Sequence, residues 1–198
     1  MAHTPKPSTK SEASRQRLVT AAGRAFRNSG FGGIGVDGLA QGAGLTSGAF
    51  YFHFKSKLEL FIESIRTGLT ELRQGVEHFQ ADNGDTWLAR FVSFYMGYKR
   101  TCSMEDGCTL PLLTAEVERA GDQARSAYQT ELTQLAAAVE KGLSGSGTMT
   151  SRQQAWAVLA LLSGGVSMAR AVQDEKLSQE IAAAIENAMI CIRLNTPS

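Results

Sequence analysis

The stretch VDGLAQGAGLTSGAFYFHF, residues 36–54, constrains the fold more than any other part of the chain. Its first half carries an apolar stripe at helical spacing, formed by Val36, Leu39, Ala40 and Ala43. Gly44 ends this segment, and Thr46 is a favourable N-cap for a second short helix that ends near His53. Two such helices joined by the link GLTS are typical of a helix-turn-helix unit, whose second helix enters the DNA major groove by its N-terminal end.

The rest of the chain shows helical periodicity and no convincing strand alternation. A first helix occupies SEASRQRLVTAAGRAFRNSG, with Ser11 as a candidate cap and Gly30 after its end. Ser56 and Glu59 have capping-box spacing and begin a helix over 56–78. Further helices are expected over 85–103, 109–120, 122–143, 151–173 and 176–194. The sequence therefore predicts an all-α fold of about nine helices.

Three regions follow from this pattern. We expect a flexible basic arm over residues 1–10, a helix-turn-helix domain over 11–55, and a helical ligand-binding and dimerisation domain over 56–198, with helix 56–78 as the link. Charge divides along the chain as well. Residues 1–60 hold eight Lys/Arg and three Asp/Glu, a net of +5, whereas the remainder holds twelve and sixteen, a net of −4. A basic front suits a polyanion such as DNA, although an ordinary solvated surface gives the same tally.

The second short helix presents two different faces. Successive residues lie 100° apart on a helix, so Ser47, Gly48, Tyr51 and Phe52 share one arc. Ala49, Phe50 and His53 lie on the other side. We expect Phe50 and Phe54 to be core, whereas two rings on the exposed arc exceed what a solvated surface needs. Gly48 weakens the helix by up to about 1 kcal/mol relative to alanine, a cost that makes sense where backbone must approach DNA closely.

The segment GFGGIGVDGLAQGAGLTSGAFYFHFKSKLELF resembles the DNA-binding region of the tetracycline-repressor-like (TetR/AcrR) family. The resemblance covers about residues 11–65 and implies a three-helix DNA-binding domain followed by a six-helix ligand and dimerisation domain. It places Thr46, Ser47, Gly48, Tyr51, His53 and Lys57 at DNA-contacting positions, and Phe52 where a tyrosine often donates to a phosphate. Gly35 stands where the family usually has a capping Ser or Thr. The basic residues Lys6, Lys10, Arg15 and Arg17 are a candidate supplement to phosphate binding.

The body is rich in aromatic residues. One predicted helix carries Trp87, Phe91, Phe94, Tyr95 and Tyr98, more aromatic area than a single helix usually buries. These rings are either core or the wall of an effector cavity, since ligand pockets are largely apolar with a few polar groups. Tyr95, Tyr98 and Trp156 would supply the polar groups.

Cys108 is a candidate sensing residue. It follows a glycine turn and precedes Pro111, which places its sulfur near a helix N-terminus, where the helix dipole lowers a thiol pKa. Glu105 and Asp106 oppose that effect, and a buried structural cysteine is the alternative. The stretch also resembles a Gly-Cys…Ala-Glu segment of a family subset, some members of which look to respond to oxidants or electrophiles. Cys102 is either a resolving partner or a packed small residue.

The last two predicted helices have small and apolar faces that suit a two-fold helix bundle. The candidate dimer-interface residues are Leu161, Gly164, Gly165, Met168, Ile181, Ile185, Ala188 and Ile192. A monomer could bury the same stripes internally. The dimer is favoured because a helix-turn-helix of this type recognises two half-sites.

These features predict a cytoplasmic, homodimeric transcriptional repressor that binds double-stranded operator DNA and is relieved by a small-molecule or electrophile effector, or by modification of Cys108. The alternatives are a DNA-binding regulator that takes no ligand and an all-helical enzyme. Catalysis is disfavoured because His3, His53 and His78 lie far apart in sequence, with no catalytic motif beside them. We expect no cofactor, no metal site and no membrane contact, and the cysteines lack zinc-site spacing.

Overall fold

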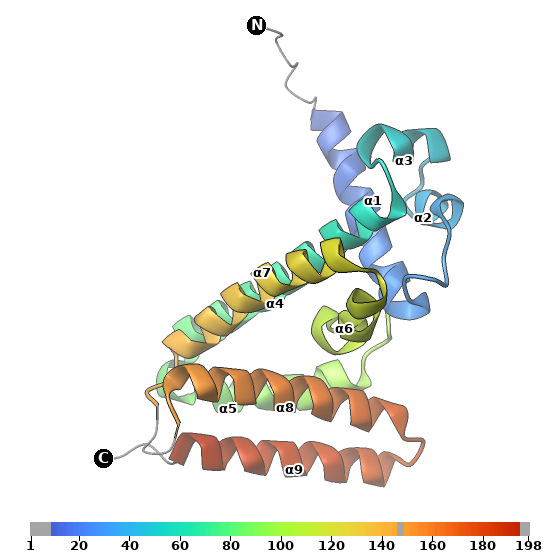
Figure 1. Ribbon diagram of the computed structural model, residues 1–198. Coiled ribbons are helices and arrows are strands. Elements are labelled where there is room, and N and C mark those ends of the chain that lie inside the picture. Colours follow the sequence, from blue (N-terminus) through green and yellow to red (C-terminus); the bar gives the residue numbers. More distant parts are fainter. Residues whose placement is uncertain (1–8, 146–148, 195–198) are drawn as a thin grey trace, which may run out of the picture.

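The computed structural model describes residues 9–145 and 149–194, with side chains described up to residue 190. Most of the described residues belong to helices, and Figure 1 shows how the helices are arranged. In chain order they are α1 (Thr9–Ser29), α2 (Val36–Gly42), α3 (Ser47–His53), α4 (Lys57–Asn83), the 3-10 turn η1 (Gly84–Thr86), α5 (Trp87–Phe94), the π-helical turn η2 (Tyr95–Lys99), α6 (Thr109–Arg119), α7 (Asp122–Lys141), α8 (Ser151–Ala171) and α9 (Glu175–Leu194). The all-α prediction is confirmed.

The first three helices, α1, α2 and α3, form a small unit, which is called the DNA-binding unit below after the role predicted for it. Its core is aromatic: Phe26 of α1 lies edge-on against Phe61 of α4 at 5.1 Å between ring centroids, and Phe31 lies 4.8 Å from Phe61. Phe50 and Phe54 are buried beside these rings, as expected. Because Phe61 belongs to α4, the unit is completed by the first turns of the linking helix.

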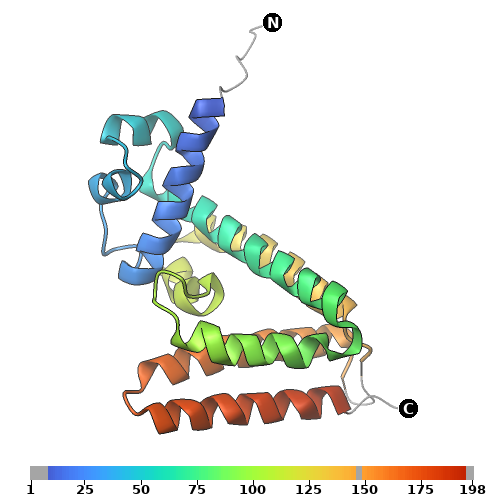
Figure 2. The ribbon, with the colours of Figure 1, turned by 180° about the vertical axis from the view of Figure 1, so that it is seen from behind.

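The body is built on two helix pairs (Figures 1 and 2). Helices α4 and α7 lie side by side along their length, and α9 packs along α8 and also contacts α5. The short helix α6 lies between these pairs, next to the C-terminal end of α1 in both views. This arrangement puts the end of α1 against the body as well as against its own unit.

Several predicted boundaries are wrong by a few residues. Helix α1 begins by Thr9, so Thr9 and Lys10 are helical and Ser11 is not its cap; the rest of the expected arm, with Lys6, lies outside the described residues. Helix α4 continues to Asn83, because helical packing along α7 persists beyond His78. The expected helix over 85–103 is divided into η1, α5 and η2. The start of α4 is correct, since the Ser56 hydroxyl accepts the Glu59 N–H at 3.1 Å.

No helix within the described ranges is both long enough and apolar enough to cross a membrane.

Candidate functional site

Helix α3 exposes the arc that the sequence singled out. Tyr51 is 60% exposed and Phe52 is 76% exposed, whereas the neighbouring Phe50 side chain belongs to the core and is 0% exposed. Gly48 is also exposed, and a Cβ added there would meet only the Thr46 hydroxyl, at 3.8 Å. One face of α3 is therefore free to approach a partner, while its other face is held by buried rings.

The N-terminal end of α3 is fixed by two side chains. The Thr46 hydroxyl accepts the Ala49 N–H at 3.2 Å, which confirms the predicted cap. The Ser47 hydroxyl donates to the Asp37 carboxylate on α2. Asp37 was not expected in this role, and only its position in the first turn of α2 hints at it. The cap fixes the first turn of α3, and the Ser47–Asp37 contact holds α3 to α2 in one relative orientation, as a helix-turn-helix requires.

Lys57 and His53 lie at the edge of this surface, and each also makes contacts within the DNA-binding unit. The Lys57 ammonium donates to the carbonyls of Phe31 at 2.9 Å and Ile34 at 3.2 Å, so it braces the loop before α2 and keeps one N–H for another partner. His53 is half-buried, with its ring 4.9 Å from the Phe52 ring. Partial burial lowers the pKa of His53, and the nearby Arg15 guanidinium lowers it further, which favours the neutral ring.

Residues 18–63 match the family model described as bacterial regulatory proteins, tetR family. Those residues span most of α1, both helices of the helix-turn-helix and the start of α4. The DNA-binding unit is therefore similar to that of tetR-family regulatory proteins.

Two curated relatives extend this similarity. The chain is 26% identical over 159 residues to the HTH-type transcriptional regulator LmrA of Bacillus subtilis, covering 77% of this chain and 84% of LmrA. It is 30% identical over 114 residues to the HTH-type transcriptional activator FasR of Mycolicibacterium smegmatis, covering 52% of each. Among solved structures, a TetR-family transcriptional regulator from Cytophaga hutchinsonii superposes with a TM-score of 0.76 at 21% identity, covering 95% of this chain and 98% of that one. The TetR fold thus extends over the body.

A cavity of about 500 Å³ lies in this TetR-type body, on the side that faces the DNA-binding unit. Of the aromatic residues predicted for an effector site, Phe91, Phe94, Tyr95 and Tyr98 line it, and so does Cys108. Trp87 and Trp156 do not. The Trp87 indole N–H donates to the Gly142 carbonyl at 2.8 Å, and Trp156 is exposed on α8 under the Arg152 guanidinium. Trp87 shares a predicted helix with the other rings but lines a different cavity, and Trp156 was expected there only as a polar group from another helix.

Cys108 is the N-cap of α6, so its predicted position at a helix N-terminus is confirmed, but the predicted effect on its acidity is wrong. The residue is 7% exposed, and burial raises the pKa of the Cys108 thiol. The neighbouring Tyr95 hydroxyl and the charges of Lys99 and Arg27 oppose this shift without cancelling it. Loss of water disfavours a thiolate more strongly here than the α6 dipole favours it.

Contacts between the DNA-binding unit and the body centre on the C-terminal end of α1. The Arg27 guanidinium donates through Nε and Nη2 to the Glu105 carbonyl, and Arg24 pairs with the Asp106 carboxylate at 3.4 Å. On α6, Glu116 accepts the Phe31 backbone N–H at 2.8 Å. No local motif predicts these pairs, because the partners lie about 80 residues apart in the sequence.

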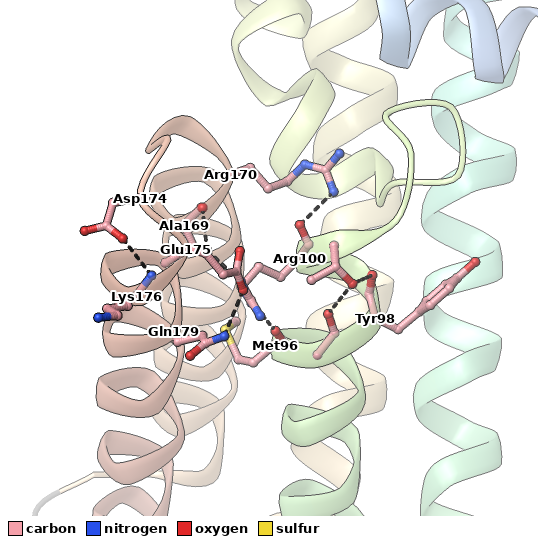
Figure 3. Close-up of polar contacts among 12 residues, drawn as sticks. Met96, Tyr98, Arg100, Ala169, Arg170, Asp174, Glu175, Lys176 and Gln179 are labelled. Atoms are coloured by element: carbon pink, nitrogen blue, oxygen red, sulfur yellow. Dashed lines mark hydrogen bonds and ion pairs between the residues drawn. The ribbon is translucent and has the colours of Figure 1, made fainter.

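The residues from 102 to 108, called the connecting loop below, are also held from the α8 side (Figure 3). Arg170 of α8 donates to the carbonyls of Lys99 and Arg100, and its second amino group lies 3.1 Å from the Met104 sulfur. Arg100 in turn donates to Glu175 and to the Ser178 hydroxyl of α9. The connecting loop is therefore held in place by guanidinium groups from α1 and from α8.

The predicted dimer stripes divide into inner and outer residues. Gly165 and Ile185 pack on each other within the chain, since a Cβ at Gly165 would lie 2.7 Å from an Ile185 methylene. This pair is an internal α8–α9 contact, as the monomer alternative anticipated, and Leu161 also packs against the core. Gly164 and Met168 are exposed on α8. Ile181 and Ala188 are half-buried, and the Ile192 side chain lies outside the described residues.

Proposed function

We propose that the chain is a homodimeric repressor that binds operator DNA through the N-terminal end of α3 and releases it when an effector binds the body. The observation that supports this most directly is the pair of exposed rings, Tyr51 and Phe52, beside the bare backbone of Gly48 on a helix fixed by its buried face. The DNA-contact set is Thr46, Ser47, Gly48, Tyr51, Phe52, His53 and Lys57. We propose residues 11–55 as the DNA-binding domain and 56–198 as the effector and dimer domain.

Affinity for the phosphate backbone would come from charges around α3. Lys10 and Arg17 are exposed on α1, and Lys55 follows α3. Arg15 contributes less, because it pairs with Glu63 at 2.9 Å and lies over the Phe54 ring. Base contacts would come from the α3 arc, where an exposed phenyl ring such as Phe52 suits a thymine methyl group.

Selection of genomic DNA fragments by the purified protein tests this proposal. Retained fragments should share a two-fold symmetric sequence, and binding should weaken steeply with salt. Tyr51→Ala and Phe52→Ala should each lower operator affinity by about tenfold or more. Met104→Ala is the matched control, since that apolar side chain is exposed on the connecting loop, away from α3 and from the outer face of α8 and α9. Equal affinity for all sequences, or an equal loss in the control, would contradict a sequence-specific site on α3.

We propose that the outer face of α8 and α9 pairs two copies of the chain. Its exposed apolar residues include Met168 on α8, together with Leu177 and Ile190 on α9. A self-complementary apolar face suits a two-fold dimer. Met168→Glu should shift the protein from dimer to monomer in sedimentation analysis, while Met104→Glu, exposed on the connecting loop, should not.

Two triggers for DNA release were expected from the sequence: occupation of a cavity by a small molecule and modification of Cys108. The open cavity beside α1 supports the first, and the burial of Cys108 weighs against the second. A coupling free energy of about 1–3 kcal/mol between effector and operator would suffice. Treatment with N-ethylmaleimide distinguishes the two: release that is lost in Cys108→Ser favours the thiol, whereas release that persists in that variant excludes it.

A further inference from the structure

The cavity of about 500 Å³ differs from a pocket enclosed by the body alone, because α1 forms one of its walls. Val19, Gly23, Arg24 and Arg27 of α1 line it opposite residues of α4, α5, η2 and the connecting loop. Its size lies within the range of small-molecule sites, roughly 300–1,000 Å³. Any occupant would therefore touch the DNA-binding unit and the body at the same time.

One half of the cavity is aromatic. Phe79 of α4 lies 5.4 Å from Phe91 and 5.6 Å from Phe94, and Phe94 stacks on Tyr98 at 5.6 Å between centroids. Phe94 and Tyr98 are substantially exposed although they line this hollow. In Figure 3 the Tyr98 ring extends from η2 away from α9 and toward α4. These rings contact one another and together form one apolar wall of the cavity, which favours a flat or apolar ligand body.

The other half is cationic. Arg24, Arg27 and Lys99 line it against two carboxylates, Glu71 and Asp106. Asp106 is already engaged by Arg24 and by the Ser103 hydroxyl. Arg27 uses Nε and Nη2 on the Glu105 carbonyl, which leaves its Nη1 amino group without a partner in the described part of the chain. A half-buried guanidinium with free donors gains more from an anion than a solvated one does.

A second polar group borders the same cavity. Tyr95 is 1% exposed and lines the cavity, and its hydroxyl lies beside the Cys108 thiol but has no nitrogen or oxygen partner among the described residues. A thiol is a weak hydrogen-bonding group, so the hydroxyl gains from a stronger acceptor. A buried hydroxyl without a strong partner costs stability, and such a group at a cavity wall is suited to a polar atom of a ligand. Both of these donors, Arg27 Nη1 and the Tyr95 hydroxyl, suit a ligand that accepts hydrogen bonds.

We propose that this cavity binds an amphipathic organic acid, with an aromatic or similarly flat apolar body against Phe94 and Tyr98 and a carboxylate against Arg24 and Arg27. This inference rests on the proposed effector function and names its ligand class. An amine of the same shape is disfavoured because the three cations of this half outnumber its two carboxylates, one of which is already engaged by Arg24. A neutral amide could accept a hydrogen bond from Arg27 through its carbonyl oxygen, but the bond would lack the charge of a carboxylate and would be weaker.

The same chemistry connects ligand binding to DNA. A ligand carboxylate competes for Arg24 with the Asp106 carboxylate and for Arg27 with the Glu105 carbonyl, which are the contacts that join α1 to the connecting loop. Loosening them weakens the hold of the connecting loop on α1, and α1 packs on α2, which in turn packs on α3. The acid thus favours a state in which the spacing of the two α3 helices of a dimer is no longer fixed, and operator affinity falls.

A matched series of three probes tests the ligand class: 2-naphthylacetate, its neutral amide 2-naphthylacetamide, and the cation 2-(2-naphthyl)ethylamine. Isothermal titration of the full-length protein should show the acid binding at least about tenfold more tightly than the amide, with the amine weaker still. Equal affinity for acid and amide, preference for the amine, or no saturable binding by any of the three below about 1 mM would overturn the proposal.

Variants locate the site. Arg27→Gln should lower affinity for the acid by about tenfold while leaving the weak amide binding unchanged. Arg90→Gln is the matched control, because Arg90 is an exposed arginine of α5 outside the cavity lining.

Gly75→Leu provides an independent variant, which is needed because Arg27→Gln also removes the contact with Glu105. Gly75 lines the cavity and a Cβ there meets nothing within 4 Å, so a leucine fills the space without displacing a neighbour. Acid binding that survives Gly75→Leu would place the ligand elsewhere.

DNA binding is measured separately, so that the two proposals fail in different ways. If the ligand-free protein does not select an operator, the proposed function fails whatever the acid does. If it selects an operator but acid binding leaves that affinity unchanged, the regulatory part of this inference fails. The expected result is operator release by the acid in the wild type and in Arg90→Gln, with release lost in Gly75→Leu.

Discussion

The DNA-binding unit and the body use aromatic residues in opposite ways. In α3, the exposure of the rings changes sharply between neighbouring positions: Phe50 is buried, whereas most of the Phe52 side chain is exposed to solvent. Only one face of this short helix packs against the rest of the unit. In α5 and η2, the rings from Phe91 to Tyr98 contact α4 and one another around a hollow. An exposed ring on a convex helix indicates a surface for a large partner, whereas exposed rings that contact each other along a cavity wall indicate a site for a small one.

The largest effect expected from this contrast comes from two phenylalanines of α3. Phe50→Ala should lower the free energy of unfolding by about 3–5 kcal/mol, since it removes a fully buried ring. Phe52→Ala should change it by less than about 0.5 kcal/mol and affect DNA affinity instead. Urea unfolding and DNA titration of both variants measure the separation. Similar stability losses in the two would contradict the assigned faces of α3.

Two glycines of α4 sharpen the comparison within the body. Gly68→Ala should destabilise the protein by about 1–3 kcal/mol, because the added Cβ would lie 2.0 Å from the Thr109 hydroxyl of α6. Gly75→Ala should stabilise it by roughly 0.5–1 kcal/mol, because its Cβ meets open cavity space and alanine is the better helix former. Thermal unfolding of the two variants measures both changes, the loss of stability in the first and the gain in the second. A stabilising Gly68→Ala would mean that α4 and α6 do not approach as closely as described.

Two helix caps, one in each region, allow a comparison between variants that should lose nearly equal stability. Thr46→Ala and Thr150→Ala each remove a threonine hydroxyl that accepts an N–H of the first turn, of α3 and α8 respectively. Each should lower stability by about 1 kcal/mol. Only Thr46→Ala should also weaken operator binding, since α3 alone carries the proposed contacts. Fluorescence anisotropy with labelled operator separates the two; equal losses of affinity would point to a global cause.

The smallest effect concerns the thiols of the connecting loop. Burial raises the pKa of Cys108, so near neutral pH it is protonated and should react with iodoacetamide more slowly than the half-buried Cys102. Its rate should increase as the pH rises toward that raised pKa, because only the thiolate reacts. Peptide mass spectrometry after timed alkylation measures both sites. Faster labelling of Cys108 than of Cys102 at neutral pH would revive the sensing hypothesis.

Local sequence signals were accurate where the physics is local. The Thr46 cap, the Gly44 turn, the apolar stripe of α2 and the two faces of α3 all depend on residues within a few positions of one another, and the structure has them as predicted. The same logic does not say which cavity a ring lines: Trp87 and Trp156 share an aromatic character with the cavity residues but make other contacts. It left Cys108 open between a sensing and a buried structural residue, because helix position can be inferred from neighbours and burial cannot.

The sequence by itself determined the all-α class, the helix-turn-helix and the surface of α3 that remains free, since these follow from helical periodicity and capping within short segments. Only the tertiary structure decided that Arg24 and Arg27 meet residues 105 and 106, that Gly165 packs on Ile185, and that α1 closes one side of a cavity. Those contacts join segments separated by tens of residues. Their selection depends on how whole helices pack, and no local pattern encodes which distant side chains will meet.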